Sequence, residues 1–217
     1  MRPAAFFDMD HTLLRINSGE RWIDFLQRRN EITRMKKWRA LGWLVEYKFS
    51  ILDMETVVGK VTASMAGESE AEFVDKCTIF VREEVIPQIA DRARAVLAEH
   101  QKKGHLVAIL SSTTPYVGEP LAQYLGIEHV LCTRLEVKEG RFTGSHLAPA
   151  CYGRGKVHYA EVFCQKHQID LKQSFFYSDS FSDRPMFERV GAPHVVNPDR
   201  RLRRHAVKVG WPVEMWQ

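Results

Sequence analysis

Cysteine is scarce in this chain, and its few copies do not form the short pairs that bind metal. There is no CxxC motif, and no cysteine lies at zinc-finger spacing from another cysteine or from a histidine. We therefore expect no zinc centre, and we expect free thiols in a reducing compartment. The four cysteines are Cys77, Cys132, Cys151 and Cys164.

Long apolar runs are missing as well. No window holds the roughly 18 consecutive apolar residues that a membrane-spanning helix needs. The apolar run near the N-terminus is only a few residues long before charges follow, which does not fit a secretory signal peptide. Internal repeats and low-complexity segments are also absent. These absences lead us to expect a soluble, cytoplasmic protein.

Charge is present with both signs but unevenly distributed. The 217 residues are 45% hydrophobic and 27% charged, which is ordinary for one large domain or a core with an insertion. The net charge of +4 is concentrated in residues 28–39 and 199–205. Solvated helix faces are the leading explanation, and attraction of an anionic substrate or membrane surface is the alternative. We expect no nucleic-acid partner.

Apolar strand-like runs alternate with helical patterns along most of the chain. Strong runs cover 4–8, 105–112 and 174–180, and weaker runs cover 128–133 and 193–197. Between them, apolar residues recur at helical spacing over 88–104, 114–126, 155–167 and 182–191, and 136–144 resembles a small hairpin. This alternation predicts an α/β fold with a doubly wound parallel sheet, which binds ligands beyond the carboxyl ends of its strands.

Residues 15–86 interrupt the alternation. They show helical patterns over 20–30, 34–52, 53–67 and 68–85. We therefore predict a catalytic core from residues 1–14 and 87–217, with residues 15–86 inserted after the first strand as a helical cap. This segment is rich in aromatic residues, for which core packing is the leading explanation and a membrane-facing surface the alternative. These aromatic residues are Trp22, Trp38, Trp43, Tyr47 and Phe49.

Four groups of polar residues stand where predicted strands end or helices begin. Asp8 and Asp10 follow the first strand, and Ser111, Ser112 and Thr113 follow the second. Further along, Lys156 opens a predicted helix, and Asp179 and Asp183 follow the run 174–180. Taken singly, these groups read as a turn, a helix N-cap, a surface lysine and an Asx turn.

Together, in this order on one predicted edge, they suit phosphoryl transfer. One carboxylate can act as a nucleophile, and a second, offset carboxylate can exchange a proton with the leaving group and water. Several carboxylates in one site need a cation, and oxygen ligands with a phosphate suit Mg²⁺. A lysine and hydroxyl groups would stabilise the charge on the transferred group.

The same segments resemble the haloacid dehalogenase superfamily. "FFDMDHTLL" (6–14), "AILSSTTP" (108–115), "GKVHYA" (155–160) and "FYSDSFSDRPMF" (176–187) are similar to its four motifs in order. The resemblance covers the whole chain and is strongest to the phosphoserine-phosphatase-like branch, subfamily IB. It implies a Rossmann-like core with a C1-type helical cap after the first strand.

The resemblance also implies a role for each motif residue. Asp8 would be the nucleophile, and Asp10 the general acid and base, with its backbone carbonyl as a metal ligand. Lys156 would neutralise the aspartyl phosphate. Ser111, the backbone of Ser112 and the loop residue Thr12 would hold the phosphoryl group.

The last motif would complete the metal site. Asp179 would bind Mg²⁺ together with Asp8, and Asp183 would organise Lys156 and metal-bound water. Ser182 stands where relatives often carry asparagine, and we expect it to support the site.

Two departures from the phosphoserine phosphatases bear on the substrate. Asn17 stands where those enzymes place a glutamate for the substrate ammonium, and Ser111-Ser112-Thr113 replaces their Ser-Gly-Gly. Both departures argue against phosphoserine. The cap residues that we expect near a substrate are Asn17, Glu20, Arg21, Asp24 and Arg28.

The sequence thus predicts a Mg²⁺-dependent phosphomonoester phosphatase that acts on a small phosphorylated metabolite through an aspartyl phosphate. Candidate substrates are histidinol phosphate, a phosphoserine-like compound or a lipid-derived phosphate. A phosphotransferase or mutase of the same fold is the nearest alternative. A catalytically weak membrane-docking or binding protein is the alternative from another class, and the sequence favours no oligomeric state.

Overall fold

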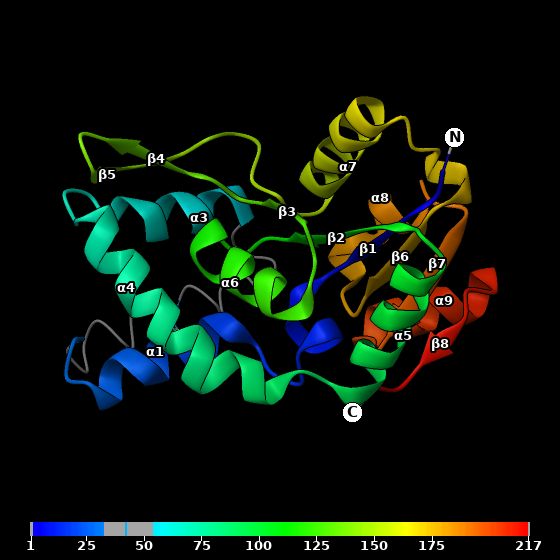
Figure 1. The fold of residues 1–217 in the computed structure, drawn as a ribbon, viewed down its shortest axis with the longest axis horizontal. Coiled ribbons are helices and arrows are strands. Elements are labelled where there is room, and N and C mark those ends of the chain that lie inside the picture. The colour runs from blue at the N-terminus through cyan, green and yellow to red at the C-terminus, as the bar shows by residue number, and fades with distance from the viewer. Residues whose placement is uncertain (1, 33–41, 43–53, 217) are drawn as a thin grey trace.

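A six-stranded parallel sheet forms the centre of the molecule (Figure 1). The computed structural model describes residues 2–32, 42 and 54–216. The strand order is β3-β2-β1-β6-β7-β8, and every neighbouring pair is parallel. The strands are β1 (Ala4–Phe7), β2 (Leu106–Ser111), β3 (His129–Cys132), β6 (Phe175–Ser178), β7 (Ala192–Val196) and β8 (Val213–Glu214).

Helices cover both faces of this sheet, and strand β1 shows why. Its side chains alternate, so Ala5 and Phe7 pack into one buried cluster while Ala4 and Phe6 pack into the other. The first cluster includes residues of α5 (Asp91–Lys102) and α6 (Pro115–Leu125). The second includes residues of α7 (Arg154–His167), α8 (Arg184–Phe187) and α9 (Arg200–Val209). The predicted doubly wound α/β fold is confirmed.

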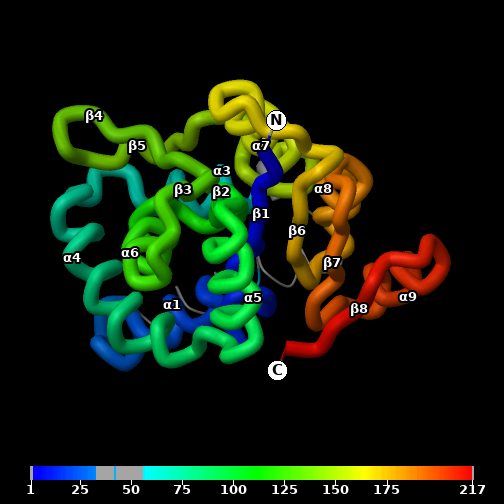
Figure 2. Tube along the Cα trace, turned by 45° about the vertical axis from the view of Figure 1, so that its right-hand side comes forward, coloured from blue at the N-terminus to red at the C-terminus, as the bar shows by residue number. Residues whose placement is uncertain are grey.

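A group of helices lies between β1 and β2 in the chain. It contains α1 (Ser18–Arg28), α3 (Met54–Ala63) and α4 (Glu70–Phe80), followed by the turns Val81–Val85 and Ile86–Gln88. In both views α4 stands at the opposite end of the molecule from α9 (Figures 1 and 2). The helix expected over 34–52 falls outside the described residues, and the division into a 15–86 cap and a two-part core stays a prediction.

The aromatic residue Trp22 supports core packing rather than a membrane-facing surface for its part of this insertion. Its ring centroid lies 5.6 Å from those of Phe25 and Phe73 and 5.1 Å from that of Phe80. Such stacked and edge-to-face contacts stabilise helix packing beyond simple burial. The other aromatic residues of the pattern, from Trp38 to Phe49, lie outside the described residues.

A β-hairpin from the second half of the chain packs against the helical insertion (Figure 1). Its strands are β4 (Leu135–Lys138) and β5 (Arg141–His146), close to the predicted 136–144. The backbone N–H of Gly67 donates to the Phe142 carbonyl at 2.8 Å, and that of Glu70 donates to the Gly140 carbonyl at 2.9 Å. The hairpin is thereby tied to the α3–α4 connection by main-chain hydrogen bonds.

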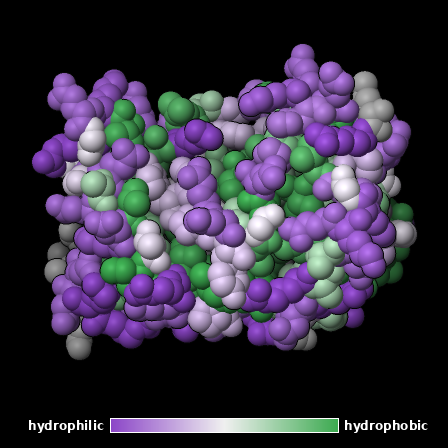
Figure 3. All heavy atoms as spheres, in the orientation of Figure 1, coloured by the Kyte–Doolittle hydropathy of each residue, from purple (hydrophilic) through white to green (hydrophobic). Residues whose placement is uncertain are grey.

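The distribution of polar side chains and the state of the cysteines agree with what the sequence led us to expect. In Figure 3, hydrophilic side chains cover the outer parts of the face shown, and apolar side chains show mainly toward its middle. All four cysteines are free and buried, as expected. Among the described residues, the helices are too short or too polar to cross a membrane.

Helix α9 and strand β8 are elements that the sequence patterns did not predict. The basic segment 199–205 forms the N-cap and first turns of α9. The Asp199 carboxylate accepts hydrogen bonds from the backbone N–H groups of Arg201, at 2.7 Å, and Leu202, at 2.8 Å. Leu202 and Ala206 are buried, so the helix turns its charged face outward, as the leading explanation for this cluster expected.

Candidate active site

The three central strands bring polar residues to one edge of the sheet. Asp8 directly follows β1, Ser111 ends β2, and Asp179 directly follows β6. The strands are parallel, and Phe7 of β1 pairs with both Ile109 and Tyr177, so the three carboxyl ends lie level. This is the edge where the sequence placed the site.

A buried lysine joins two of the carboxylates. The Lys156 ammonium lies 3.0 Å from Asp8 Oδ1 and 2.6 Å from Asp183 Oδ2. The hydroxyl of Ser178 also donates to Asp183 Oδ2, at 2.7 Å. Lys156 and Asp183 are almost fully buried. The second carboxylate oxygen of Asp183, Oδ1, has no hydrogen-bond partner among the described residues. A buried charge of this kind persists only when it is paired.

A glycine lets Lys156 reach this position. A Cβ atom on Gly155 would lie 1.9 Å from the carbonyl oxygen of Ala150, far inside van der Waals contact. The start of α7 therefore packs directly against the backbone at Ala150. Only glycine allows that close approach, and the next residue, Lys156, points to the carboxylates.

The loop after β1 holds the second carboxylate. Asp10 is in an extended conformation, and His11 follows with a left-handed φ of 52°, so the chain turns sharply after the strand. The Asp10 carboxylate accepts a 3.0 Å hydrogen bond from the backbone N–H of Ser18, the first residue of α1. The side chain of Asn197 donates to the His11 carbonyl at 2.7 Å and steadies the turn. Asp10 is thereby directed toward the helical insertion.

The electrostatics of the cluster favour added positive charge. Burial raises the pKa of Asp10 to about 7, and the Asp8 charge adds to this rise. Burial and the charges of Asp8 and Asp183 raise the pKa of Asp179 to about 9. Although burial alone would lower the pKa of Lys156, Asp183 and Asp8 raise it above its usual value. Four carboxylates are thus within electrostatic reach of one lysine, which contacts two of them.

These donors fit a hard divalent cation better than any softer metal. Carboxylate and carbonyl oxygens are the ligands that Mg²⁺ prefers, and it commonly keeps waters in its remaining positions. Within residues 2–32, 42 and 54–216, no three histidine, cysteine, aspartate or glutamate side chains are placed to enclose a metal ion. Two carboxylates, a backbone carbonyl and water would be a sufficient set.

The family model for haloacid dehalogenase-like hydrolases matches residues 5–188 of this chain. The chain belongs to that family. The predicted resemblance is confirmed, and all four motif segments, 6–14, 108–115, 155–160 and 176–187, lie within the matched range. The parallel sheet and the helical insertion after its first strand are therefore the fold of a haloacid dehalogenase-like hydrolase.

Several proteins resemble this hydrolase over nearly its whole length. A histidinol-phosphatase of Neisseria meningitidis is 29% identical, with 98% of each chain covered. A phosphoserine phosphatase of Mycobacterium tuberculosis, SerB1, is 32% identical over 98% of this chain and 70% of its own length. A Bordetella pertussis protein of unknown function has a crystal structure that matches with a TM-score of 0.90 at 30% identity, covering 98% of both chains.

More distant structures share the fold. A phosphoserine phosphatase solved as a phospho-aspartyl intermediate analogue matches with a TM-score of 0.70 at 17% identity, covering 100% of this hydrolase and 94% of that chain. At this identity the likeness concerns the fold alone. It agrees with a core and a helical insertion arranged as described above.

The residues predicted to hold the phosphoryl group differ in exposure. Ser111 and Thr12 are buried, and Ser112 is exposed at the end of β2. The Thr12 hydroxyl lacks a hydrogen-bond partner among the described residues. Ser182 lies in the turn before α8, where its hydroxyl is 2.8 Å from that of Ser180. Their predicted roles stay predictions.

All five residues predicted to face a substrate lie on helix α1 or at its N-cap. Asn17 is its N-cap, and its side-chain oxygen accepts a 3.0 Å hydrogen bond from the backbone N–H of Glu20. The oxygen of Asn17 therefore already serves the helix. Glu20 is exposed, and Asp24 is half-buried one turn later.

The two cap arginines share one acidic partner. Arg21 lies 2.8 Å and Arg28 lies 2.5 Å from the carboxylate of Glu84, in the turn that follows α4. Their charges therefore hold α1 to the end of the insertion. This structural role competes with the predicted role in substrate binding.

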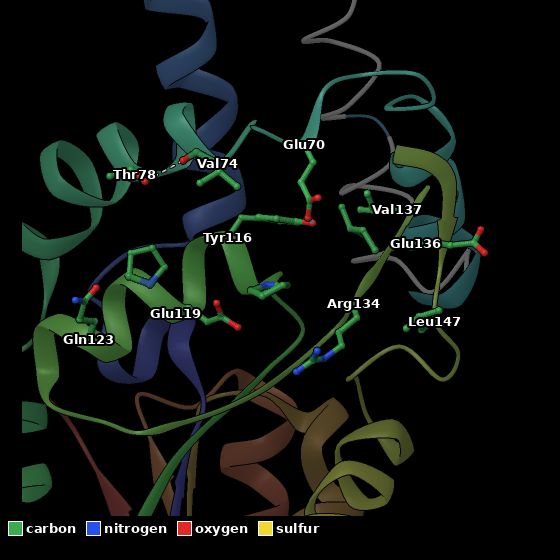
Figure 4. Close-up of a pocket in the computed structure, with 13 residues that line it drawn as sticks. Glu70, Val74, Thr78, Tyr116, Glu119, Gln123, Arg134, Glu136, Val137 and Leu147 are labelled. Carbon is green, nitrogen blue, oxygen red and sulfur yellow. Dashed lines mark hydrogen bonds between the residues drawn. The ribbon is translucent and has the colours of Figure 1, made fainter. Parts of the chain in front are cut away.

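A hollow of about 830 Å³ lies between α4, α6 and the hairpin (Figure 4). Tyr116 of α6 donates a 2.7 Å hydrogen bond across it to Glu70 of α4. None of its lining residues belongs to the carboxylate cluster, although Pro115, which ends the motif segment 108–115, is among them.

Sequence patterns missed three residues that organise the site. Ser178 bonds Asp183, Asn197 bonds the loop after β1, and Asp199 accepts a 2.7 Å hydrogen bond from the Phe181 backbone N–H. Asn197 directly follows β7, and Ser178 ends β6. Asp8 was predicted because it is a polar residue at the end of a strand, and the same pattern could have identified Ser178 and Asn197.

Proposed function

We propose that this hydrolase is a phosphatase that cleaves phosphomonoesters of small organic molecules through an aspartyl-phosphate intermediate. The observation that carries the proposal is the buried ion-pair network of Asp8, Lys156 and Asp183 at the carboxyl edge of the sheet. The nearby Asp10, whose pKa lies near 7, adds the second chemical group that such a reaction needs. Its two most relevant relatives are named as phosphatases.

In the first step the Asp8 carboxylate attacks the phosphorus atom of the substrate. A new O–P bond forms on Asp8 as the P–O bond to the substrate alcohol breaks. Asp10 in its protonated form gives its proton to the departing alkoxide, so a neutral alcohol leaves. Lys156, held 3.0 Å from Asp8, balances charge on the aspartyl phosphate.

In the second step water releases the phosphate. Asp10, now ionised, accepts a proton from the water as its oxygen attacks phosphorus. The bond between phosphorus and the Asp8 oxygen breaks, which returns Asp8 as a carboxylate and Asp10 in its acid form. A pKa of about 7 suits this double role, because both protonation states are then accessible at neutral pH.

Mg²⁺ would be held by the carboxylates of Asp8 and Asp179 and the main-chain carbonyl of Asp10. When bound, it supplies positive charge that stabilises the oxygens of the transferred phosphoryl group. The raised pKa of Asp179, caused by burial and then by Asp8 and Asp183, supports a cation at this place. Asp183 would keep Lys156 in position through its 2.6 Å contact.

Histidinol phosphate is the first substrate to test. The relative named histidinol-phosphatase matches 98% of both chains, whereas the relative named phosphoserine phosphatase is longer than this chain. Asn17 capping α1, in place of a carboxylate that could bind a substrate ammonium, also disfavours phosphoserine.

The test is a phosphate-release screen on purified protein, with Mg²⁺ and with EDTA. The panel contains histidinol phosphate, phosphoserine, sugar phosphates, nucleotides and lysolipid phosphates. We expect release that needs Mg²⁺ and falls at least about a thousandfold in Asp8→Asn. Activity that survives Asp8→Asn would overturn the aspartyl-phosphate mechanism, and silence across the panel would overturn the proposed function. An added acceptor alcohol separates hydrolysis from phosphotransfer, since a transferase would yield a new phosphoester.

A further inference from the structure

Helix α9 carries a stripe of cations that the proposed function does not use. Arg201, Arg204 and Lys208 are three and four residues apart, so their side chains lie along one side of the helix. All three are exposed, and none forms an ion pair with a carboxylate in residues 2–32, 42 and 54–216. By contrast, Arg15 and Arg189, which are also exposed, each contact a carboxylate.

The stripe borders a defined hollow, which we call the α9 groove. It measures about 240 Å³ and is lined by Phe181, Arg201, Arg204, His205 and Lys208. The Arg201 guanidinium lies over the Phe181 ring, 4.6 Å from its centroid, and the His205 ring approaches Phe181 edge-on at 5.9 Å. The groove therefore has an aromatic wall, and one of its guanidinium groups, that of Arg201, packs against this wall.

Two nearby carboxylates do not neutralise these cations. The Asp199 carboxylate is occupied by the backbone N–H groups of the first turn of α9 and by that of Phe181. Glu188 pairs with Arg184 at 3.3 Å. The three cations of the stripe keep their positive charge facing solvent.

The spacing of the cations indicates the kind of anion that suits them. At a rise of about 1.5 Å per residue, Arg201 and Lys208 are separated by roughly 10 Å along the helix, with Arg204 between them. A single compact anion reaches only part of this span. A chain of linked phosphates carries several charges in a row, and arginine binds phosphate oxygens with two parallel hydrogen bonds.

We propose that the α9 groove is a binding site for the polyphosphate group of a small molecule. The site is separate from the carboxylate cluster, yet it contacts the same loop. Phe181 lies between Asp179 and Asp183, and the Asp199 backbone N–H donates to the Asp179 carbonyl at 2.9 Å. The proposal stands on the groove itself and does not depend on the proposed phosphatase activity.

Calorimetric titration of the full chain in EDTA tests this site, with pyrophosphate and ATP as probes. EDTA removes the divalent cation that would favour anions at the carboxylate cluster. We expect saturable binding of both probes, at least tenfold weaker in Arg204→Gln and weaker again in Arg201→Gln/Arg204→Gln. Arg203→Gln is the matched control, because it removes the same charge from the same helix outside the groove, and we expect less than a twofold change.

The two probes and a lipid arm separate the sources of the polyphosphate. Equal affinities would assign recognition to the phosphate chain, and tighter ATP would add a contact with the nucleoside; both outcomes support the site. Flotation with vesicles of neutral lipid and phosphatidylserine supplies the third arm. Vesicle binding that depends on Arg204, without binding of either soluble probe, would overturn the proposal in favour of a lipid-docking face.

Three other results would also overturn it. One is the absence of saturable binding of pyrophosphate and ATP. Another is an equal loss in Arg203→Gln and Arg204→Gln, which would indicate only diffuse attraction by the basic helix. The third is unchanged binding in the double variant, which would locate the anion elsewhere. Circular dichroism of each variant verifies that the helix content is unchanged.

Discussion

Replacing Lys156 by methionine should destabilise the protein in a strongly pH-dependent way. Lys156 is 2% exposed and lies 2.6 Å from Asp183, which is 1% exposed. Methionine has a similar length but no charge, so Asp183 would stay buried without its cation. Removing one partner of a buried ion pair commonly costs about 3–5 kcal/mol.

The upper limit of the destabilisation in Lys156→Met follows from proton binding by Asp183. Burial raises the pKa of Asp183, and Lys156 opposes that rise, so the variant has a still higher pKa for this carboxyl. The folded variant can therefore avoid a buried charge by binding a proton that the unfolded chain releases above pH 4. Keeping that proton bound lowers the free energy of unfolding by about 1.4 kcal/mol for each pH unit above about 4, which is about 4 kcal/mol at pH 7 and about 1.5 kcal/mol at pH 5.

Because the folded state then binds more protons than the unfolded state, the stability of the variant rises as pH falls from 7 to 5. Urea unfolding in EDTA at several pH values, for wild type and Lys156→Met, measures this difference. Lys166→Met is the control, since Lys166 is exposed on the same helix. A destabilisation that is the same at pH 5 and pH 7 would refute the reasoning and point to packing alone.

Three further predictions concern residues around the site and the core. Gly155→Ala should lower phosphate release by at least about tenfold and stability by about 1–3 kcal/mol, because its Cβ would meet the Ala150 carbonyl at 1.9 Å. Asn197→Ala should lower kcat, and it should lower the free energy of unfolding by about 1–3 kcal/mol, because it removes the 2.7 Å hydrogen bond to the His11 carbonyl. Burial, with neighbouring positive charges, lowers the pKa of His100 to about 4, so stability should fall by up to about 3 kcal/mol as pH drops from 6.5 to 4.

Each of these has a direct check. Phosphate release and urea unfolding test Gly155→Ala, and an unchanged activity would contradict the close-packed start of α7. For Asn197→Ala, a loss of stability with full kcat would limit that residue to a structural role. The unfolded state binds the His100 proton below pH 6.5 while the folded state does not, which sets the direction of the third effect. A His100→Gln variant should lack that part of the pH dependence, and identical pH profiles would contradict it.

The parallel, doubly wound sheet and the edge at which its polar residues gather were predictable for a physical reason. Strands buried on both faces consist of short apolar runs, and a carboxylate after such a run, as at Asp8, signals a functional strand end. Alternation with helical patterns then brings these ends to one edge. Helix α9 was not predicted, because six of its ten residues are charged or histidine and only Leu202 and Ala206 mark its buried side.

The ion-pair partners were not predictable from sequence alone. Arg21 and Arg28 were expected to face a substrate, yet both contact Glu84, which follows more than fifty residues later. A charged residue on a helix has the same sequence signature whether it faces a ligand or an acidic neighbour. Only the packing of α1 against the end of the insertion decides between the two.

The sequence by itself determined the fold class, the motif residues and the family of this hydrolase, since these depend on local periodicity and on residues close together in the chain. The tertiary structure decided which charges are paired, which are buried and which remain free. Lys156 meets Asp8 across 148 positions of the chain, and Arg204 meets no acid within the described residues. Burial and pairing at long range set the pKa of Asp10 and the exposed charge of the α9 groove, because both depend on neighbours that only folding brings together.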